Sequence, residues 1–121
     1  MHTITIQRTL SEQLLKDVFT TAIEGGISYW AVGSVKRDAE LNVIEARLLP
    51  AEGEDEFEEK HVTLATIAAG IERLLGPVPI SHDGIISNVM QAISNDDASY
   101  IDADDADAVI QAGVFGELIY G

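Results

Sequence analysis

The chain has 121 residues, and its 21 acidic against 7 basic residues give a formal net charge of −14. Such a charge disfavours binding to DNA, RNA or anionic membrane surfaces and favours encounter with basic partners. Hydrophobic residues make up 46% of the chain. Disordered acidic chains are poor in apolar residues, so the composition predicts a folded body that carries its charge on the surface.

The length suits one domain spanning residues 1–121. The chain has no cysteine, which excludes disulfides, thiolate chemistry and zinc–thiolate sites. Residues 1–10 lack the basic and apolar segments of a secretion signal, and no apolar run approaches the ~18 residues needed to span a bilayer. We therefore expect a soluble protein of the cytoplasm.

The first predicted elements are a strand and a helix. Residues 3–7 alternate polar and apolar side chains, which is typical of a short strand. Thr9 and Glu12 match a capping box, and apolar residues then follow at helical spacing. Gly25 and Gly26 are expected to end this helix through a left-handed C-cap.

The next segment predicts an antiparallel hairpin. Residues 28–35 are aromatic and β-branched, as strands often are, and residues 36–42 are polar and turn-like. Residues 43–49 alternate again and form the second strand of the prediction. Much of the positive charge falls in this hairpin, on Lys36, Arg37 and Arg47.

An acidic run at residues 50–60 separates the hairpin from the helical part of the chain. We predict a solvated loop there, which leads into a short strand at 57–62. Thr63 is then expected to cap a helix that ends at Gly76 and Pro77.

Two more helices complete the chain. Ser81 is expected to cap the third, which residues 95–97 break, and Asp102 to cap the fourth, which ends near Gly116. Residues 118–120 are expected to return to the body. The predicted order is β-α-β-β-α-α-α, an α+β fold in which about four helices cover one face of a small antiparallel sheet of 2–4 strands.

Four aspartates gather at the start of the predicted fourth helix: Asp102, Asp104, Asp105 and Asp107. A calcium loop of the EF-hand type needs glycine at its sixth position and glutamate at its twelfth, where this chain has Asp107 and Gly113. A helix N-terminus explains the cluster better, because aspartate is a good cap and carboxylates suit the positive end of the helix dipole.

The acidic run allows two interpretations. It is either a flexible loop with solvated charges or a binding arm for a basic partner. Phe57, a lone aromatic residue among carboxylates, would anchor the loop to the body or anchor a partner. The candidate contact residues in the run are Glu54, Asp55, Glu56, Glu58 and Glu59.

No catalytic, cofactor or metal motif stands out, and we predict a protein that is not an enzyme and has no cofactor. His2, His61 and His82 do not have the spacing of convergent metal ligands. Ser81, His82 and Asp83 are sequence neighbours, which is not the geometry of a catalytic triad. The phosphate-binding glycine patterns are absent.

A ligand pocket is an alternative, since aromatic residues dominate such sites. Tyr29 and Trp30 are the candidates for its lining, and ordinary core packing is the other explanation for them.

Three segments carry a resemblance: 23–31 (IEGGISYWA), 41–43 (LNV) and 101–121 (IDADDADAVIQAGVFGELIYG). With these the chain resembles a family of small uncharacterised acidic proteins of actinobacterial bacteriophages and mobile elements. The resemblance implies a phage or mobile-element setting and transfers no activity or site residue. Small acidic phage proteins often act on host proteins.

The leading hypothesis is therefore a non-enzymatic interaction protein that binds a basic surface on a host protein. Its sharpest form is a nucleic-acid mimic of the anti-CRISPR or anti-restriction type. Carboxylates at i and i+3 on a helix lie ~5–6 Å apart and can imitate a row of phosphates, a spacing found in Asp102/Asp105 and Asp104/Asp107. The alternatives are a small-ligand-binding protein and a phage structural component, and the oligomeric state stays open, with a homodimer as one option.

Overall fold

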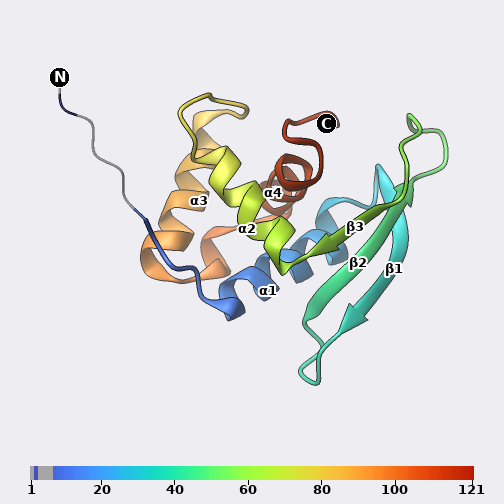
Figure 1. The fold of residues 1–121 in the computed structure, drawn as a ribbon, viewed down its shortest axis with the longest axis horizontal. Helices are drawn as coiled ribbons and strands as arrows, with labels where there is room; N and C mark the ends of the chain where they lie inside the picture. The colour runs from blue at the N-terminus through green and yellow to red at the C-terminus, as the bar shows by residue number, and fades with distance from the viewer. Residues whose placement is uncertain (1, 3–6) are drawn as a thin grey trace.

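The structure, a computed structural model, describes residues 2 and 7–121. It confirms the α+β prediction, with the strands together in the chain and most helices after them; Figure 1 shows the helices gathered on one side of the sheet. The strand predicted at 3–7 lies outside the described residues apart from Gln7, which belongs to no strand. The elements are α1 (Glu12–Thr21), the π-helical turn η1 (Ala22–Gly26), β1 (Ala31–Arg37), β2 (Val43–Pro50), β3 (Lys60–Thr63), α2 (Leu64–Leu74), α3 (Asp83–Asn95), the 3-10 turn η2 (Ala98–Tyr100) and α4 (Ala103–Phe115).

The three strands form one antiparallel sheet in the order β1-β2-β3, which confirms the predicted hairpin. The β1–β2 register runs from Ala31 opposite Pro50 to Arg37 opposite Val43. Asp38 organises the turn between them, because its carboxylate accepts backbone hydrogen bonds within the turn at 3.0 Å and pairs with a lysine of α1 at 2.9 Å. The hairpin is thereby tied to the helical layer.

Two strands begin later than predicted. The prediction started the first strand at residue 28, but the carbonyl of Ile27 accepts hydrogen bonds from the N–H groups of Trp30 and Ala31 at 3.0 and 2.9 Å. This turn precedes β1 and overrides the strand propensity of the aromatic residues. The short strand predicted at 57–62 is β3, which begins only at Lys60.

Two helices begin at caps other than the predicted ones. α1 follows Ser11, not Thr9, and the Ser11 hydroxyl accepts the N–H of Leu14 at 3.1 Å. α3 follows His82, not Ser81, and His82 Nδ1 accepts the N–H three residues further on at 3.4 Å. Several residues near a helix start can cap it, and the path of the incoming chain decides which one does.

Two predicted caps are confirmed, and both are reciprocal. Thr63 begins α2 in a capping box with Thr66, and Asp102 begins α4 in a capping box with Asp105. Gly116 ends α4 in the left-handed conformation, at φ 76°. Each of these signals lies within a few residues of sequence, so it could be found without tertiary information.

The first helical segment ends at the predicted glycines, but it does not end through the predicted backbone conformation. The chain leaves α1 through the π-helical turn η1, and neither Gly25 nor Gly26 has a positive φ, so the predicted left-handed C-cap is wrong. Gly26 is required by packing, because a Cβ there would lie 2.7 Å from the carbonyl oxygen of Ala103 in α4.

α2 and α4 pack closely through glycines. A Cβ on Gly70 would lie 2.0 Å from the carbonyl oxygen of Val109, and a Cβ on Gly113 would lie 2.3 Å from that of Thr66. Both glycines thus allow the backbones of the two helices to approach closely. α4 is consequently a central helix whose residues from Asp105 to Ala112 are all buried.

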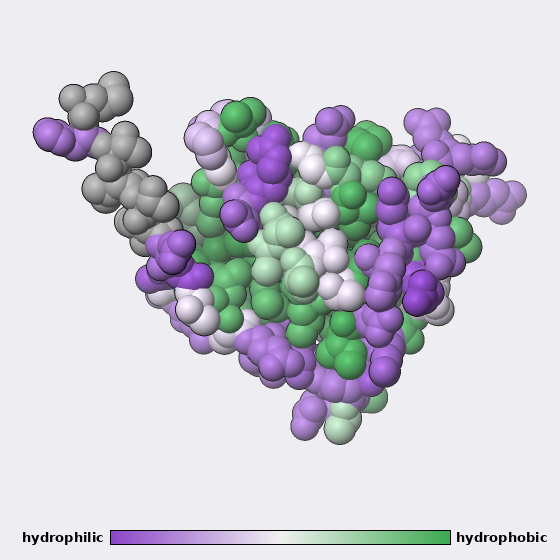
Figure 2. Space-filling view, viewed as in Figure 1, coloured by the Kyte–Doolittle hydropathy of each residue, from purple (hydrophilic) through white to green (hydrophobic). Residues whose placement is uncertain are grey.

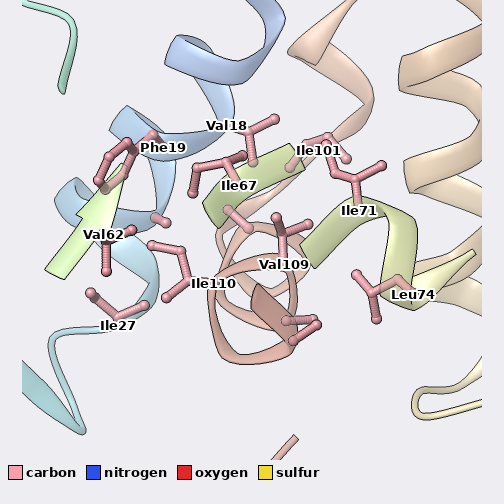
Figure 3. Close-up of a cluster of buried hydrophobic side chains, with 14 of the residues drawn as sticks. Val18, Phe19, Ile27, Val62, Ile67, Ile71, Leu74, Ile101, Val109 and Ile110 are labelled. Atoms are coloured by element: carbon pink, nitrogen blue, oxygen red, sulfur yellow. The ribbon is translucent and has the colours of Figure 1, made fainter. Parts of the chain in front are cut away.

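One hydrophobic core joins the helices to the inner face of the sheet. Figure 3 shows its centre, where side chains of α1, α2 and α4 converge on β3. None of the helices in the described part of the chain is long and apolar enough to cross a membrane. The core residues labelled in the figure are Val18, Phe19, Ile27, Val62, Ile67, Ile71, Leu74, Ile101, Val109 and Ile110.

Candidate functional site

The acidic loop joins β2 to β3 and exposes all its carboxylates. All five predicted contact residues, Glu54, Asp55, Glu56, Glu58 and Glu59, are exposed, as is Glu52 before them. In the view of Figure 2, hydrophilic residues gather over the strands and this loop, while the centre of the face is paler or apolar. The loop thus presents a continuous negative surface at one end of the sheet.

The loop is anchored to the body at two places. The ring of Phe57 packs edge-on against Trp30 and Phe115, with ring centroids 6.0 and 5.6 Å apart. The hydroxyl of Tyr120 donates a hydrogen bond to the carbonyl of Asp55 at 3.3 Å. Of the two roles considered for Phe57, the structure shows the anchor to the body. The carboxylates on either side of it are therefore displayed from a fixed point.

Few of these carboxylates are neutralised by a neighbouring cation. Within residues 2 and 7–121, Glu59 alone among the loop carboxylates has a salt bridge, to Arg47 at 3.3 Å. Lys60, next in the chain, lies over the ring of Phe115 with its Nζ 5.9 Å from the ring centroid. The charge between Glu52 and Glu58 consequently faces solvent without a counterion from the described chain.

The aspartate cluster of α4 is divided by the fold. Asp102 and Asp104 are exposed, whereas Asp105 and Asp107 are only 2% and 8% exposed. Asp105 accepts hydrogen bonds at 3.0 Å from Asn88 and from the N–H of Asp102. Burial raises the pKa of Asp105 above its usual value. The predicted pairs Asp102/Asp105 and Asp104/Asp107 therefore do not form an exposed row, and the expectation that all four lie on a contact surface is wrong.

Asp107 is the centre of a buried hydrogen-bond network. Its carboxylate accepts from the hydroxyl of Tyr29 at 2.6 Å, from the indole N–H of Trp30 at 2.8 Å and from the side-chain amide of Gln111 at 2.9 Å. The carbonyl of Gln111 accepts the N–H groups of Ile119 and Tyr120, both at 2.8 Å. The network thus joins α4 to the segment before β1 and to the C-terminal residues.

This network shifts the pKa of the Tyr29 hydroxyl. Burial, together with the hydrogen bond to Asp107, raises the pKa of Tyr29 above its usual value. All donors to the Asp107 carboxylate are neutral groups. The arrangement fixes these side chains in place.

The alternative site, a ligand pocket at Tyr29 and Trp30, gains no support from the geometry. Trp30 is fully buried, and Tyr120 stacks on it with ring centroids 5.0 Å apart and an interplanar angle of 4°. A shallow groove of about 430 Å³ runs along α3, beside Ile86 and Met90, and is not lined by these rings.

The histidines lie apart and have local roles. His61 Nε2 lies 2.6 Å from a carboxylate oxygen of Glu45, and this hydrogen bond lowers the pKa of Glu45. His82 caps α3, and His2 is exposed. The described residues contain no group of three or more histidine, aspartate or glutamate side chains placed to hold a metal ion.

Sequence reasoning missed the buried polar pair Asp107 and Gln111. Their i, i+4 spacing is visible in the sequence, and the other residues from 106 to 115 are all small or apolar. A helical segment without a polar face is typical of a central helix, and this was the available signal. Comparisons of the chain with models of protein families, with curated proteins and with solved structures gave no match.

Proposed function

We propose that the chain is a non-enzymatic interaction protein whose acidic loop binds a basic surface on a host protein. The observation that carries the proposal is the loop at 52–59, where exposed carboxylates stand on a segment that Phe57 anchors to the core. A pre-anchored surface loses less conformational entropy on binding than a free arm. Asp102 and Asp104 belong to the proposed surface, and the buried Asp105 and Asp107 do not.

The charge density of the loop supports the nucleic-acid mimic form of this proposal. Glu54, Asp55, Glu56, Glu58 and Glu59 place a carboxylate at almost every position. An extended chain rises about 3.3 Å per residue and its successive side chains point to opposite sides, so carboxylates on one side lie about 6.6 Å apart. A protein surface that neutralises phosphates with lysine and arginine would meet a dense run of negative charges here, as it does on DNA.

A bacteriophage or mobile-element setting fits the family resemblance of the chain and places the target in the host cytoplasm. In that setting a DNA-binding protein of host defence, such as a CRISPR or restriction component, is the expected partner. The high negative charge would speed the encounter with such a surface through electrostatic steering. The same charge would keep the protein off the nucleic acid itself.

A tagged pull-down from bacterial lysate tests the proposal. The expected result is capture of a nucleic-acid-binding protein that elutes with rising salt and is displaced by excess DNA, because both act on the same charged contacts. Capture that is insensitive to salt and to DNA would contradict the mimic. Capture of no protein partner would contradict the proposed function.

Two charge-matched variants show whether the loop is responsible. Replacing Glu54, Asp55 and Glu56 by their amides should weaken capture about tenfold or more, because three exposed contacts to basic groups are lost. The control replaces Glu12, Glu40 and Glu72, which are also exposed but lie elsewhere. The control removes the same charge and should retain most of the binding. Equal losses in the two variants would show that net charge alone, and not the loop, drives capture.

A further inference from the structure

Among residues 2 and 7–121, β1 is an edge strand with no neighbour on its second side. The order β1-β2-β3 leaves it paired on one side only. Every residue of β1 after Ala31 is exposed, on both faces of the strand. Figure 1 shows β1 at the margin of the molecule, away from the helices. Natural proteins usually cover or shorten such edges, because the unpaired backbone groups accept another strand.

The register identifies which backbone groups are open. The N–H of Ala51 donates to the carbonyl of Trp30, so residues 30 and 51 form a hydrogen-bonded pair next to Ala31 opposite Pro50. Hydrogen-bonded and non-bonded pairs alternate along an antiparallel ladder. Residues 32, 34 and 36 therefore bond to β2, and the N–H and C=O groups of Gly33 and Val35 point to the open edge.

Apolar side chains flank this edge. Val32 and Val35 of β1 are 52% and 40% exposed, and Leu49, which lies opposite Val32 in β2, is 45% exposed. Val32 and Leu49 share the outer face of the sheet, and Val35 lies on the other face. Apolar surface is thus available on both sides of the open backbone groups.

The β1 edge carries positive charge, which is scarce in this molecule. In a chain with only 7 basic residues, Lys36 and Arg37 belong to β1 and Arg47 to β2. Neighbouring carboxylates are already paired: Glu24 with Arg37 at 3.2 Å and Glu59 with Arg47 at 3.3 Å. The edge therefore adds no local excess of negative charge to the general repulsion between two bodies of charge −14.

We propose that β1 is a self-association edge, which pairs antiparallel with β1 of a second copy about a two-fold axis at Ser34. In this register the N–H and C=O groups of Gly33 in each copy form hydrogen bonds with the C=O and N–H groups of Val35 in the other copy. The two sheets would join into one continuous sheet.

The distribution of charge favours a second copy as the occupant. In the proposed register Lys36 faces Val32 of the other copy and not the other Lys36. The two lysines lie four residues apart along the ladder, about 14 Å at ~3.4 Å per residue. This exceeds the Debye length of about 10 Å at 0.1 M salt. The isologous contact therefore places no like charges opposite each other.

Sedimentation velocity over a concentration series, at low and moderate salt, tests the proposal. We expect a monomer–dimer equilibrium that tightens as salt rises, because screening weakens the repulsion between two chains of charge −14. Amide hydrogen exchange at Gly33 and Val35 should slow with dimer formation. A protein that stays monomeric up to about 1 mM, the weak end of the affinity scale, would overturn the proposal.

Two substitutions assign the dimer to this edge. Ser34→Lys puts like charges together at the axis and should raise the dimer Kd about tenfold or more. Val35→Pro removes an outward N–H that β2 does not use, a change tolerated on edge strands, and should abolish dimerisation. Ala69→Lys, on an exposed position of α2, is the charge-matched control and should leave the Kd unchanged.

The outcomes separate self-association from host binding. A dimer that survives Ser34→Lys and Val35→Pro, or that Ala69→Lys weakens equally, would overturn the assignment to β1. Self-association is expected to strengthen with salt, whereas capture of a basic host protein is expected to weaken. A foreign strand that binds β1 of a monomeric protein would also overturn the proposal, because the second copy would then not be the occupant.

Discussion

Asp107 is a carboxylate that the fold removes from water and surrounds with neutral donors. It receives hydrogen bonds from Tyr29, Trp30 and Gln111, which come from two distant parts of the chain. A buried charge is stable only when such donors replace its hydration. The side chain therefore acts as a polar link between α4 and the segment that leads into β1.

Asp107→Ala should lower the free energy of unfolding by about 2–4 kcal/mol, because it leaves the buried indole N–H of Trp30 without a partner. Urea unfolding followed by fluorescence measures this, and Trp30 is the only tryptophan. Asp104→Ala, on the exposed side of the same helix, is the control and should change stability by no more than about 1 kcal/mol. Equal effects would show that Asp107 acts only through the helix dipole.

Asp105 makes the stability depend on pH. Burial raises its pKa above the value of 3.8 that it has when unfolded, so its ionisation opposes folding. The cost is absent below pH 3.8 and grows as the pH rises through the raised pKa. Asp105→Asn keeps an oxygen for the two hydrogen bonds, and its stability relative to the wild type should increase as the pH rises from about 4 towards neutrality.

The control for this prediction is the dependence of stability on pH below about pH 4. The hydrogen bond from Lys16 lowers the pKa of Asp38 to about 2. The stability from Asp38 is fully present above its unfolded value of 3.8 and is lost as the pH falls towards 2. Urea midpoints at successive pH values should show this acid loss in both wild type and Asp105→Asn. Parallel curves at all pH values would mean that Asp105 has no shifted titration.

Helix contacts depend on glycine where backbones meet. Gly70→Ala should lower the free energy of unfolding by about 1–3 kcal/mol, because the new Cβ would lie 2.0 Å from the carbonyl oxygen of Val109 and must push α2 away from α4. The loss should occur although alanine favours a helix by about 1 kcal/mol over glycine. Thermal unfolding monitored by circular dichroism measures the change.

Gly25→Ala is the matched control for Gly70→Ala. Its Cβ would meet Ala103 Cβ at 3.8 Å, an ordinary contact. This substitution should leave stability unchanged or raise it by up to about 1 kcal/mol. If both alanine variants gained stability, the close approach of α2 and α4 would not constrain Gly70.

Signals at the ends of elements were predictable where they are local. The caps Thr63, Asp102 and Gly116 each act through hydrogen bonds or a backbone conformation within a few residues. Ser11 and His82 displaced the predicted caps, because the chain before each helix approaches from a direction that tertiary packing sets. The same limit applies to strand β1, whose start depends on the turn at Ile27.

The whole molecule carries a charge that opposes its own folding. No lysine or arginine follows Arg73, so α3 and α4 contribute carboxylates and no lysine or arginine. Repulsion among these groups acts over the Debye length and weakens as salt is added. The sign of this effect depends only on the net charge of −14.

Stability should therefore rise with sodium chloride between low and moderate ionic strength, by a few tenths of a kcal/mol to about 1 kcal/mol. Urea midpoints at about 0.01 and 0.15 M salt, where the Debye length falls from about 30 to about 8 Å, measure it. The variant with amides at Glu12, Glu40 and Glu72 has less charge and should gain less. Identical midpoints at both salt concentrations would contradict the prediction.

The sequence by itself determined the kinds of elements, their order and the exposure of the acidic loop. Periodicity, caps and turn residues are local properties, and a run of carboxylates next to Pro50 has no low-energy place inside a protein. From these the α+β fold and the exposure of Glu54, Asp55, Glu56, Glu58 and Glu59 could be predicted. The same reasoning placed Phe57 as a candidate anchor, which its contacts with Trp30 confirm.

The tertiary structure alone decided which aspartates of α4 are buried and that β1, in the described part of the chain, is paired on one side only. Tyr29 and Trp30 reach Asp107 from 78 and 77 positions away in the chain. The exposure of β1 likewise depends on the helices failing to cover it. Burial is set by neighbours that are distant in sequence, and no local pattern specifies which of several carboxylates on a helix they will cover.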